Sequence, residues 1–275
     1  MLLKRIWIIL LCAVIGVGTI DYAVHFRFFD RPLTQAKQEE FQSKILLPSN
    51  FTLAASVNSF DTVKNTLQAA KQNVSKGSYA LELNVAVGTN GKLYLADGPD
   101  YITEESELLD SVFKAFRDKD YLRYILNMKN FGNPDTLAEL LLKYDLIGKV
   151  MMTGIALEDL EELAPSYCNC YICVELTPDT IRLNSSKACL EAMQHCVDYG
   201  VYAVSCTLPQ ITDELRDALV KVHELHLVIR DVHSEFSMYE SLSFNPIVVI
   251  TDQPDLLYKM MLSQDYLDLN QENVF

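Results

Sequence analysis

Eight apolar, β-type runs alternate with helical segments along this chain, and this alternation constrains the fold more than any other feature. The runs begin near residues 51, 79, 124, 150, 171, 201, 227 and 247, and a short extra ribbon is expected at 93–96. Strands that alternate with helices predict a parallel sheet. Eight such units in about 210 residues predict a closed α/β barrel of the TIM-type (β/α)8 class. A doubly wound open sheet is the alternative, but no Gly-rich fingerprint follows the first run.

The predicted barrel spans residues 49–263, and three shorter segments flank it. Residues 1–30 form an anchor or signal segment, 31–48 a polar linker or a first short helix, and 264–275 an acidic tail. A hydrophobic fraction of 49% is enough for a full core in a domain of this length.

The N-terminal segment has the features of a membrane anchor. Lys4 and Arg5 precede an apolar run from Ile6 to Ile20, which extends past Asp21 if that residue lies at the interface. A spanning helix needs roughly 20 apolar residues. The basic pair predicts a single-pass anchor with a cytoplasmic N-terminus and an extracytoplasmic barrel. The alternative is a cleaved signal peptide and a secreted protein, because Gly16-Val17-Gly18 is a plausible cleavage site.

The net charge argues against nucleic acid as a partner. Lys and Arg together number 23 and Asp and Glu 37, which gives a net charge of −14. An acidic surface repels phosphate backbones. The charge itself needs no further explanation than a solvated surface.

Six of the seven cysteines are concentrated between residues 168 and 206. The spacing of Cys168, Cys170 and Cys173 resembles a metal-binding motif, but no clear fourth ligand is near. The interpretation we favour is that these cysteines are small apolar residues of strands and a helix.

The stretch from Tyr79 to Pro99 contains the first candidate site residues. Two β-type runs meet there at a Gly-Thr-Asn-Gly turn. Glu82 and Asn84 are two residues apart on the first run, so both side chains point to the same face. Two carboxylates in this arrangement could hold a hard cation, but the second member here is an amide.

Four segments of the chain resemble the glycerophosphodiester phosphodiesterases, a family of phospholipase C-like barrels. They are Lys64–Ala70, Leu81–Val85, Val222–Val232 and Asn245–Leu257, which contains a Thr-Asp-x-Pro motif. The resemblance covers roughly Phe51 to Met261. It implies a barrel whose C-terminal mouth holds a divalent metal and two catalytic histidines.

At the positions that match the family's motifs, most of the implied catalytic residues are replaced. The family's first strand ends in Ala-His-Arg-Gly, whereas this chain has Ala55-Ser56-Val57-Asn58. Ala96 stands where the second histidine is expected. Asn84 and Asn127 stand where two of three metal carboxylates are expected, which leaves the retained residues Glu82, Asp97 and Lys129.

The chain is therefore predicted to be a catalytically degenerate member of such a family. No cofactor is expected, and Glu82 would be a weak metal ligand among neutral neighbours. The predicted partner is a small polar or phosphorylated ligand, bound by Lys129 and Asp97, or another protein.

The alternative is an active phosphoric diester hydrolase of lipid metabolism that uses Ca²⁺ or Mg²⁺ in a rebuilt site. Asp231 and His233 follow the seventh predicted strand and could form a relocated acid–base pair there. The competing interpretation is that His233 is a loop residue and that Asp231 pairs with Lys129 or Arg230. An inward-facing pocket around Lys129 would favour a ligand, because a buried Lys needs an anionic partner. A mouth filled by Tyr94, Tyr101 or Phe131 would favour a structural or partner-binding domain with no ligand in the pocket.

Overall fold

The computed structural model describes residues 33–56, 65–177 and 185–263. The anchor or signal segment, the acidic tail, and Asp61, which the sequence suggested as a helix cap, lie outside these ranges. Within them, no helix has both the length and the hydropathy to cross a bilayer.

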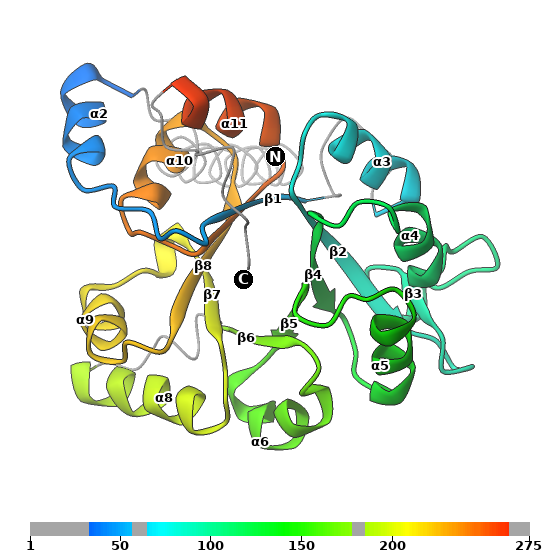
Figure 1. Cartoon of the computed structure of the whole chain (residues 1–275). Helices are drawn as coiled ribbons and strands as arrows, with labels where there is room; N and C mark the ends of the chain where they lie inside the picture. Colours follow the sequence, from blue (N-terminus) through cyan, green and yellow to red (C-terminus); the bar gives the residue numbers. More distant parts are fainter. Residues whose placement is uncertain (1–32, 57–64, 178–184, 264–275) are drawn as a thin grey trace, which may run out of the picture.

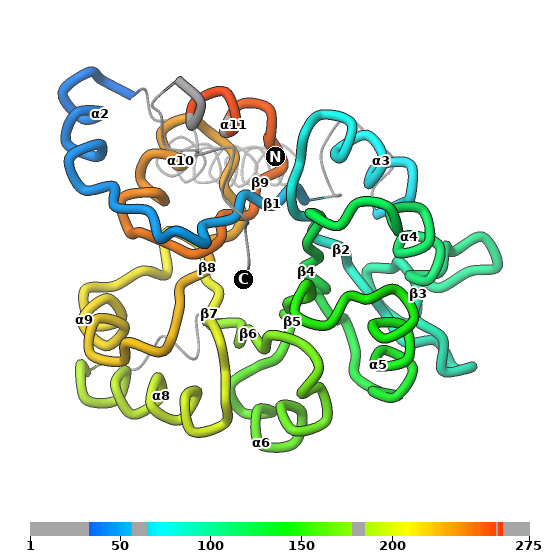
Figure 2. Tube along the Cα trace, viewed as in Figure 1, coloured from blue at the N-terminus to red at the C-terminus, as the bar shows by residue number. Residues whose placement is uncertain are grey.

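Eight parallel strands close into a barrel, as predicted (Figure 1). β1 pairs in parallel with both β2 and β9, which closes the ring and excludes the open sheet. Figure 2 shows β9 beside β1. β3 (Leu93–Leu95) is the predicted extra ribbon, antiparallel to β2. The barrel strands are β1 (Thr52–Ser56), β2 (Ala80–Val87), β4 (Arg123–Met128), β5 (Val150–Ile155), β6 (Tyr171–Glu175), β7 (Ala203–Thr207), β8 (His226–Val232) and β9 (Val248–Thr251).

Helices surround the strand ring (Figure 1). Ser185 and Thr212, residue types that favour the N-cap position, cap their helices by accepting hydrogen bonds from Ala188 N and Leu215 N. The first barrel helix is capped by Thr66. The described α-helices are α2 (Gln35–Gln42), α3 (Leu67–Ser75), α4 (Leu109–Ala115), α5 (Pro134–Lys143), α6 (Leu160–Leu163), α8 (Ser186–Asp198), α9 (Asp213–Lys221), α10 (Glu235–Leu242) and α11 (Pro254–Ser263).

Four short 3₁₀ helices complete the described elements. They are η1 (Pro99–Tyr101), η2 (Leu157–Asp159), η3 (Ala164–Tyr167) and η4 (Leu208–Gln210). The short helix α6 lies between η2 and η3, and Pro165 lies within η3.

The helix α2 lies in the segment that the sequence assigned to a linker or a short helix. Its Phe41 packs against Phe236 of α10, with ring centroids 5.5 Å apart. Gln38 Nε2 donates a hydrogen bond of 2.8 Å to the Tyr239 hydroxyl. This segment is therefore an element of the folded domain.

Two apolar layers hold the barrel together, because side chains of a strand alternate between its two faces. The outer layer lies between strands and helices and contains most of the buried residues. The inner layer fills the barrel and includes Ala54, Ile125, Met151, Val228 and Ile250. Full burial of a Leu, Ile, Val or Met side chain stabilises a fold by about 1.5–3 kcal/mol. The filled interior leaves only the ends of the barrel open to a ligand.

The six cysteines of the described ranges form no disulfide bonds. The buried ones are Cys173, Cys189, Cys196 and Cys206, whereas Cys168 is exposed and Cys170 is intermediate. Burial raises the pKa of the Cys196 and Cys206 thiols to about 12, which keeps both neutral. The apolar interpretation is confirmed for the four buried cysteines.

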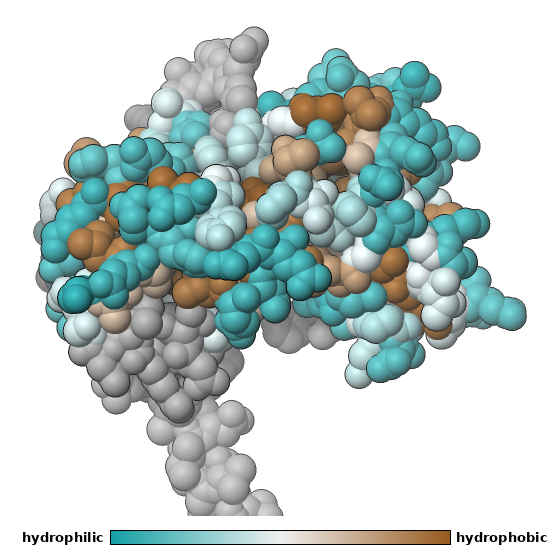
Figure 3. Space-filling view, turned by 90° about the horizontal axis from the view of Figure 1, so that it is seen from below, coloured by the Kyte–Doolittle hydropathy of each residue, from teal (hydrophilic) through white to brown (hydrophobic). Residues whose placement is uncertain are grey.

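The exterior agrees with an acidic, solvated protein. On the face seen in Figure 3, hydrophilic side chains predominate and hydrophobic ones lie between them in small groups.

Candidate functional site

A cavity of about 290 Å³ opens at the C-terminal ends of the barrel strands, the end at which such barrels carry their sites. It lies among the ends of β1, β2, β4, β8 and β9. Its lining residues are Ser56, Glu82, Asn84, Asn127, Lys129, Arg230, Asp231, His233, Ile250, Thr251 and Asp252.

Glu82 and Asn84 of β2 both face this cavity, as the two-residue spacing predicted. Glu82 is only 8% exposed. Burial raises the pKa of its carboxyl group, and a hydrogen bond with Ser56 opposes that rise. Repulsion from Asp231 adds to the rise. The retained carboxyl group is therefore biased toward its neutral form.

The side-chain amide of Asn84 has one satisfied end and one unsatisfied end. Its Nδ2 donates a hydrogen bond of 2.6 Å to Asp97 Oδ1. Its Oδ1 is buried and accepts no hydrogen bond from the described residues. Because Asp97 holds the nitrogen, the amide oxygen is the end left for another donor.

Asn65 fixes the backbone of Asn84 from the segment before α3. Asn65 Oδ1 accepts from Asn84 N at 3.0 Å, and Asn65 Nδ2 donates to Asn84 O at 2.8 Å. Asn65 has a φ of 53°, in the left-handed region that Asn tolerates better than most residues. Its side chain thus makes the two backbone hydrogen bonds to β2 that a neighbouring strand would make.

Asn127 of β4 lies opposite Asn84 in the parallel register, so the two substituted metal positions are neighbours. Lys129 follows β4, lines the cavity and is exposed. Ser56 also lines the cavity. Ala96 and Asp97 are absent from the lining. Ala96 is buried, whereas Asp97 is exposed and supports Asn84 from beside the cavity.

Arg230 of β8 is a lining residue that the sequence interpretation did not include among the site residues. Its Nη2 contacts Glu175 Oε1 of β6, and its Nη1 lies 3.3 Å from Asp231 Oδ2. The predicted pairing of Asp231 with Arg230 is therefore confirmed. Arg230 Nε is buried and donates to no described residue. Asp231 has a φ of 61°, beside the irregular register between β8 and β9.

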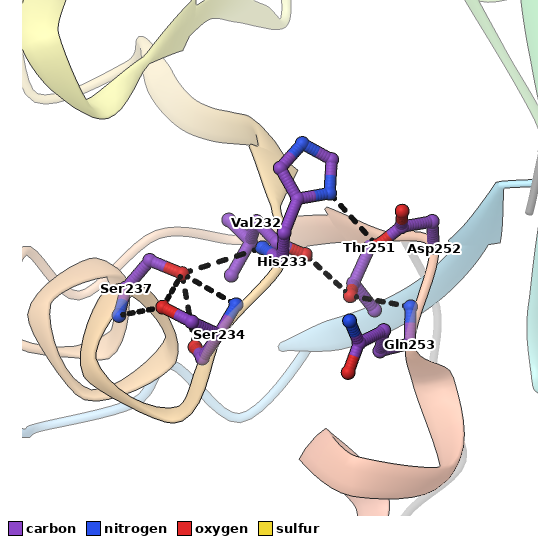
Figure 4. Close-up of polar contacts among 7 residues, drawn as sticks. All are labelled: Val232, His233, Ser234, Ser237, Thr251, Asp252 and Gln253. Carbon is purple, nitrogen blue, oxygen red and sulfur yellow. Dashed lines mark hydrogen bonds and ion pairs between the residues drawn. The ribbon is translucent and has the colours of Figure 1, made fainter. Parts of the chain in front are cut away.

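His233, just after β8, pairs with Asp252, which follows β9 (Figure 4). The distance from His233 Nδ1 to Asp252 Oδ1 is 2.8 Å. This hydrogen bond raises the pKa of His233, although partial burial opposes the rise. The second ring nitrogen points away from Asp252 (Figure 4). The sequence interpretation did not include Asp252 among the site residues and missed it as a partner of His233.

The cavity does not fit a divalent metal of the Ca²⁺ or Mg²⁺ type. Ca²⁺ prefers six to eight oxygen ligands, usually with several carboxylates. The matched positions supply one buried carboxyl group and two neutral amides. In the part of the chain that the structure describes, no three His, Cys, Asp or Glu side chains are grouped closely enough to hold a metal ion. The Cys168–Cys173 motif is therefore not arranged as a metal site.

No protein-family model and no curated protein matches this sequence. Solved structures do match its fold. A glycerophosphodiester phosphodiesterase of Thermotoga maritima is similar with a TM-score of 0.61 and 16% identity, over 76% of this chain and 98% of that one. A glycerophosphodiester phosphodiesterase of Parabacteroides distasonis matches with a TM-score of 0.62 and 14% identity, over 78% of this chain and 98% of that one. A glycerophosphodiester phosphodiesterase of Agrobacterium tumefaciens matches with a TM-score of 0.60 and 13% identity, over 78% of this chain and 99% of that one.

This chain has the glycerophosphodiester phosphodiesterase fold. Its barrel covers nearly the whole length of those chains, so the likeness is one of complete domains. Within this glycerophosphodiesterase-type barrel, Ser56, Asn84 and Asn127 lie at the mouth where the sequence comparison placed them.

Proposed function

We propose that this protein is a catalytically degenerate glycerophosphodiesterase-type barrel that binds a small polar or phosphorylated ligand at its mouth. The observation that carries the proposal is the donor set of the cavity. Glu82 is buried and biased toward its neutral form, and amides occupy the neighbouring positions Asn84 and Asn127.

Loss of the family reaction follows from the chemistry of a phosphodiester. A divalent ion must neutralise the phosphate, and an acid and a base must transfer protons. The general acid–base contribution alone is about 10²–10⁴-fold in rate. Ser56 and Ala96 cannot supply the two histidines, and Ala96 does not face the cavity.

Retention of a binding role is supported by the open cavity around Lys129. Tyr94, Tyr101 and Phe131, which could have filled the mouth, do not line it. A small cavity with converging polar groups is the usual form of a ligand site. The N-terminal apolar segment, residues 1–30, is proposed to anchor this binding domain to a membrane, with a secreted form as the alternative.

A second candidate, an active phosphodiesterase with a rebuilt site, has one observation in its favour. His233 and Asp252 form a hydrogen-bonded pair at the mouth, and such pairs serve as general bases in many hydrolases. The opposing fact is that the described lining residues bring no set of carboxylates to bind a metal.

The test is calorimetric titration of the purified full-length chain with Ca²⁺ and Mg²⁺, followed by a glycerophosphodiester hydrolysis assay in the same buffer. We expect millimolar or weaker metal binding and no turnover. The matched controls are the Glu82→Gln and His233→Gln variants. Metal-dependent turnover that either variant abolishes would establish the active alternative and refute the degenerate one.

A further inference from the structure

Two buried polar atoms of opposite kind belong to residues that line one cavity, and neither atom has a hydrogen-bond partner among the described residues. Asn84 Oδ1 can only accept a hydrogen bond, whereas Arg230 Nε can only donate one. Asn84 as a whole is only 6% exposed. An unsatisfied buried polar group costs about 1–3 kcal/mol, so such atoms are uncommon in a folded protein without a functional reason.

The orientation of the Asn84 amide is fixed by a neighbour outside the cavity. Asp97 Oδ1 accepts from Asn84 Nδ2, and a carboxylate cannot serve as partner to the amide oxygen instead. The clamp from Asn65 holds the same residue by its backbone. These contacts therefore hold Asn84 Oδ1 in an orientation in which it has no hydrogen-bond donor among the described residues.

Most of the positive charge in the wall is already paired. Arg230 is bound by Glu175 and Asp231, and His233 by Asp252. Among the described lining residues, this leaves Lys129 as the cation without an ion pair. A phosphate monoester carries about two negative charges at pH 7, and the single charge of Lys129 would offset only one of them.

We propose that the mouth binds an uncharged polyhydroxyl ligand, a polyol or a sugar, through Asn84 Oδ1 and Arg230 Nε. A hydroxyl group both donates and accepts, so a ligand with several hydroxyl groups can satisfy both atoms without a charge of its own. Phosphate oxygens offer acceptors to Arg230 but no donor to Asn84. A volume of about 290 Å³ lies at the small end of ligand sites and suits a compound of this size. This inference rests on the proposed non-hydrolytic function and narrows its ligand class.

The experiment is ligand-observed NMR with calorimetry on the full-length chain, in EDTA and in a detergent without a sugar head group. The probes are glycerol, xylitol and glucose, compared with glycerol 3-phosphate and inorganic phosphate. We expect saturable binding of at least one uncharged probe, at least tenfold tighter than either phosphate.

Three variants locate the binding. Asn84→Leu should weaken it at least tenfold, which corresponds to about 1.4 kcal/mol. Asn90→Leu, the same change on the exposed hairpin turn, should leave it unaltered. Asp97→Asn, which lets the Asn84 amide rotate without altering the lining, should weaken it by a smaller factor and keep the fold.

Two outcomes would overturn the inference. One is that none of the three uncharged probes binds. The other is that only the phosphorylated probe binds and that Lys129→Met abolishes this binding. Either result would leave the non-hydrolytic proposal standing, because that proposal fails only if metal-dependent hydrolysis is found.

Discussion

The buried side chain of Glu82 links the stability of the fold to pH. It is the retained carboxyl group of the matched metal positions, and its burial raises its pKa above the value in the unfolded chain. Folding therefore favours the protonated form. Its stabilising contribution is complete below the unfolded-state pKa and falls as the pH rises through the interval up to the folded-state pKa.

The Glu82→Gln variant should lack this decrease of stability with rising pH, because its side chain does not ionise. The free energy of unfolding of the wild type should decrease relative to the variant as the pH rises above the unfolded-state pKa, by about 1.4 kcal/mol per unit of pKa shift. Urea unfolding of both proteins at several pH values between 4 and about 8 measures the difference. Parallel pH profiles would show that Glu82 titrates normally.

His233 has a linkage of the same sign as Glu82, because its pKa is also raised in the folded state, here by a hydrogen bond that stabilises its charged form. That stabilisation is complete below the unfolded-state pKa and is lost as the pH rises through the folded-state pKa. Asp252→Asn should lower the pKa of His233, which NMR titration of the ring protons measures. Asp231→Asn is the matched control and should lower it less, since the hydrogen bond from Asp252 is the larger cause. Equal shifts in both variants would contradict this assignment.

Among the elements, the segment before α3 and the strand β2 depend on each other through Asn65. Asn65→Gly keeps the left-handed backbone available but removes both hydrogen bonds to Asn84. We expect a loss of about 1–3 kcal/mol in the free energy of unfolding, because Asn84 N loses its partner, whereas Asn84 O keeps a hydrogen bond from Ala96 N.

Asn133→Gly is the control for that prediction. Asn133 also has a left-handed φ, of 51°, but its side chain makes an exposed contact with Gly91 O. The expected loss there is below about 1 kcal/mol. Similar losses in urea unfolding of both variants would mean that the Asn65 clamp contributes little.

The order of elements could be predicted from the sequence, because each strand carries its own apolar run. Helix caps such as Ser185 and Thr212 are also predictable, because an N-cap residue bonds to a backbone group only three residues further along the chain. The partners at the mouth could not be predicted in this way. His233–Asp252 and Arg230–Glu175 join different strands, and only closure of the barrel brings them together. The orientation of Asn84 toward Asp97 is likewise set by the β2–β3 hairpin.

At the scale of the whole molecule, the barrel brings together at one mouth the three residues that the sequence resemblance matched to metal carboxylates. Asn84 and Asn127 are neighbours on the adjacent strands β2 and β4, and Glu82 lies two residues before Asn84 on β2. The double variant Asn84→Asp, Asn127→Glu would place three carboxylates there. We expect Ca²⁺ to bind this variant at least tenfold tighter than the wild type in calorimetry, and to raise its melting temperature.

The control for this prediction is the triple variant that also carries Glu82→Gln. It should lose most of the gained Ca²⁺ affinity if the three side chains converge on one ion. Unchanged weak binding in the double variant would mean that the mouth has lost the geometry of a metal site as well as its carboxylates.

The pairing of β1 with both β2 and β9 has a consequence for synthesis on the ribosome. β1 emerges early, but the strand that covers one of its edges, Val248–Thr251, emerges after the other seven. Until then β1 presents an unpaired edge, the kind of surface on which β-proteins aggregate. Contacts between such distant segments also slow folding. Ribosome-bound chains that stop before residue 248 should therefore depend on chaperones, which longer nascent chains would no longer need.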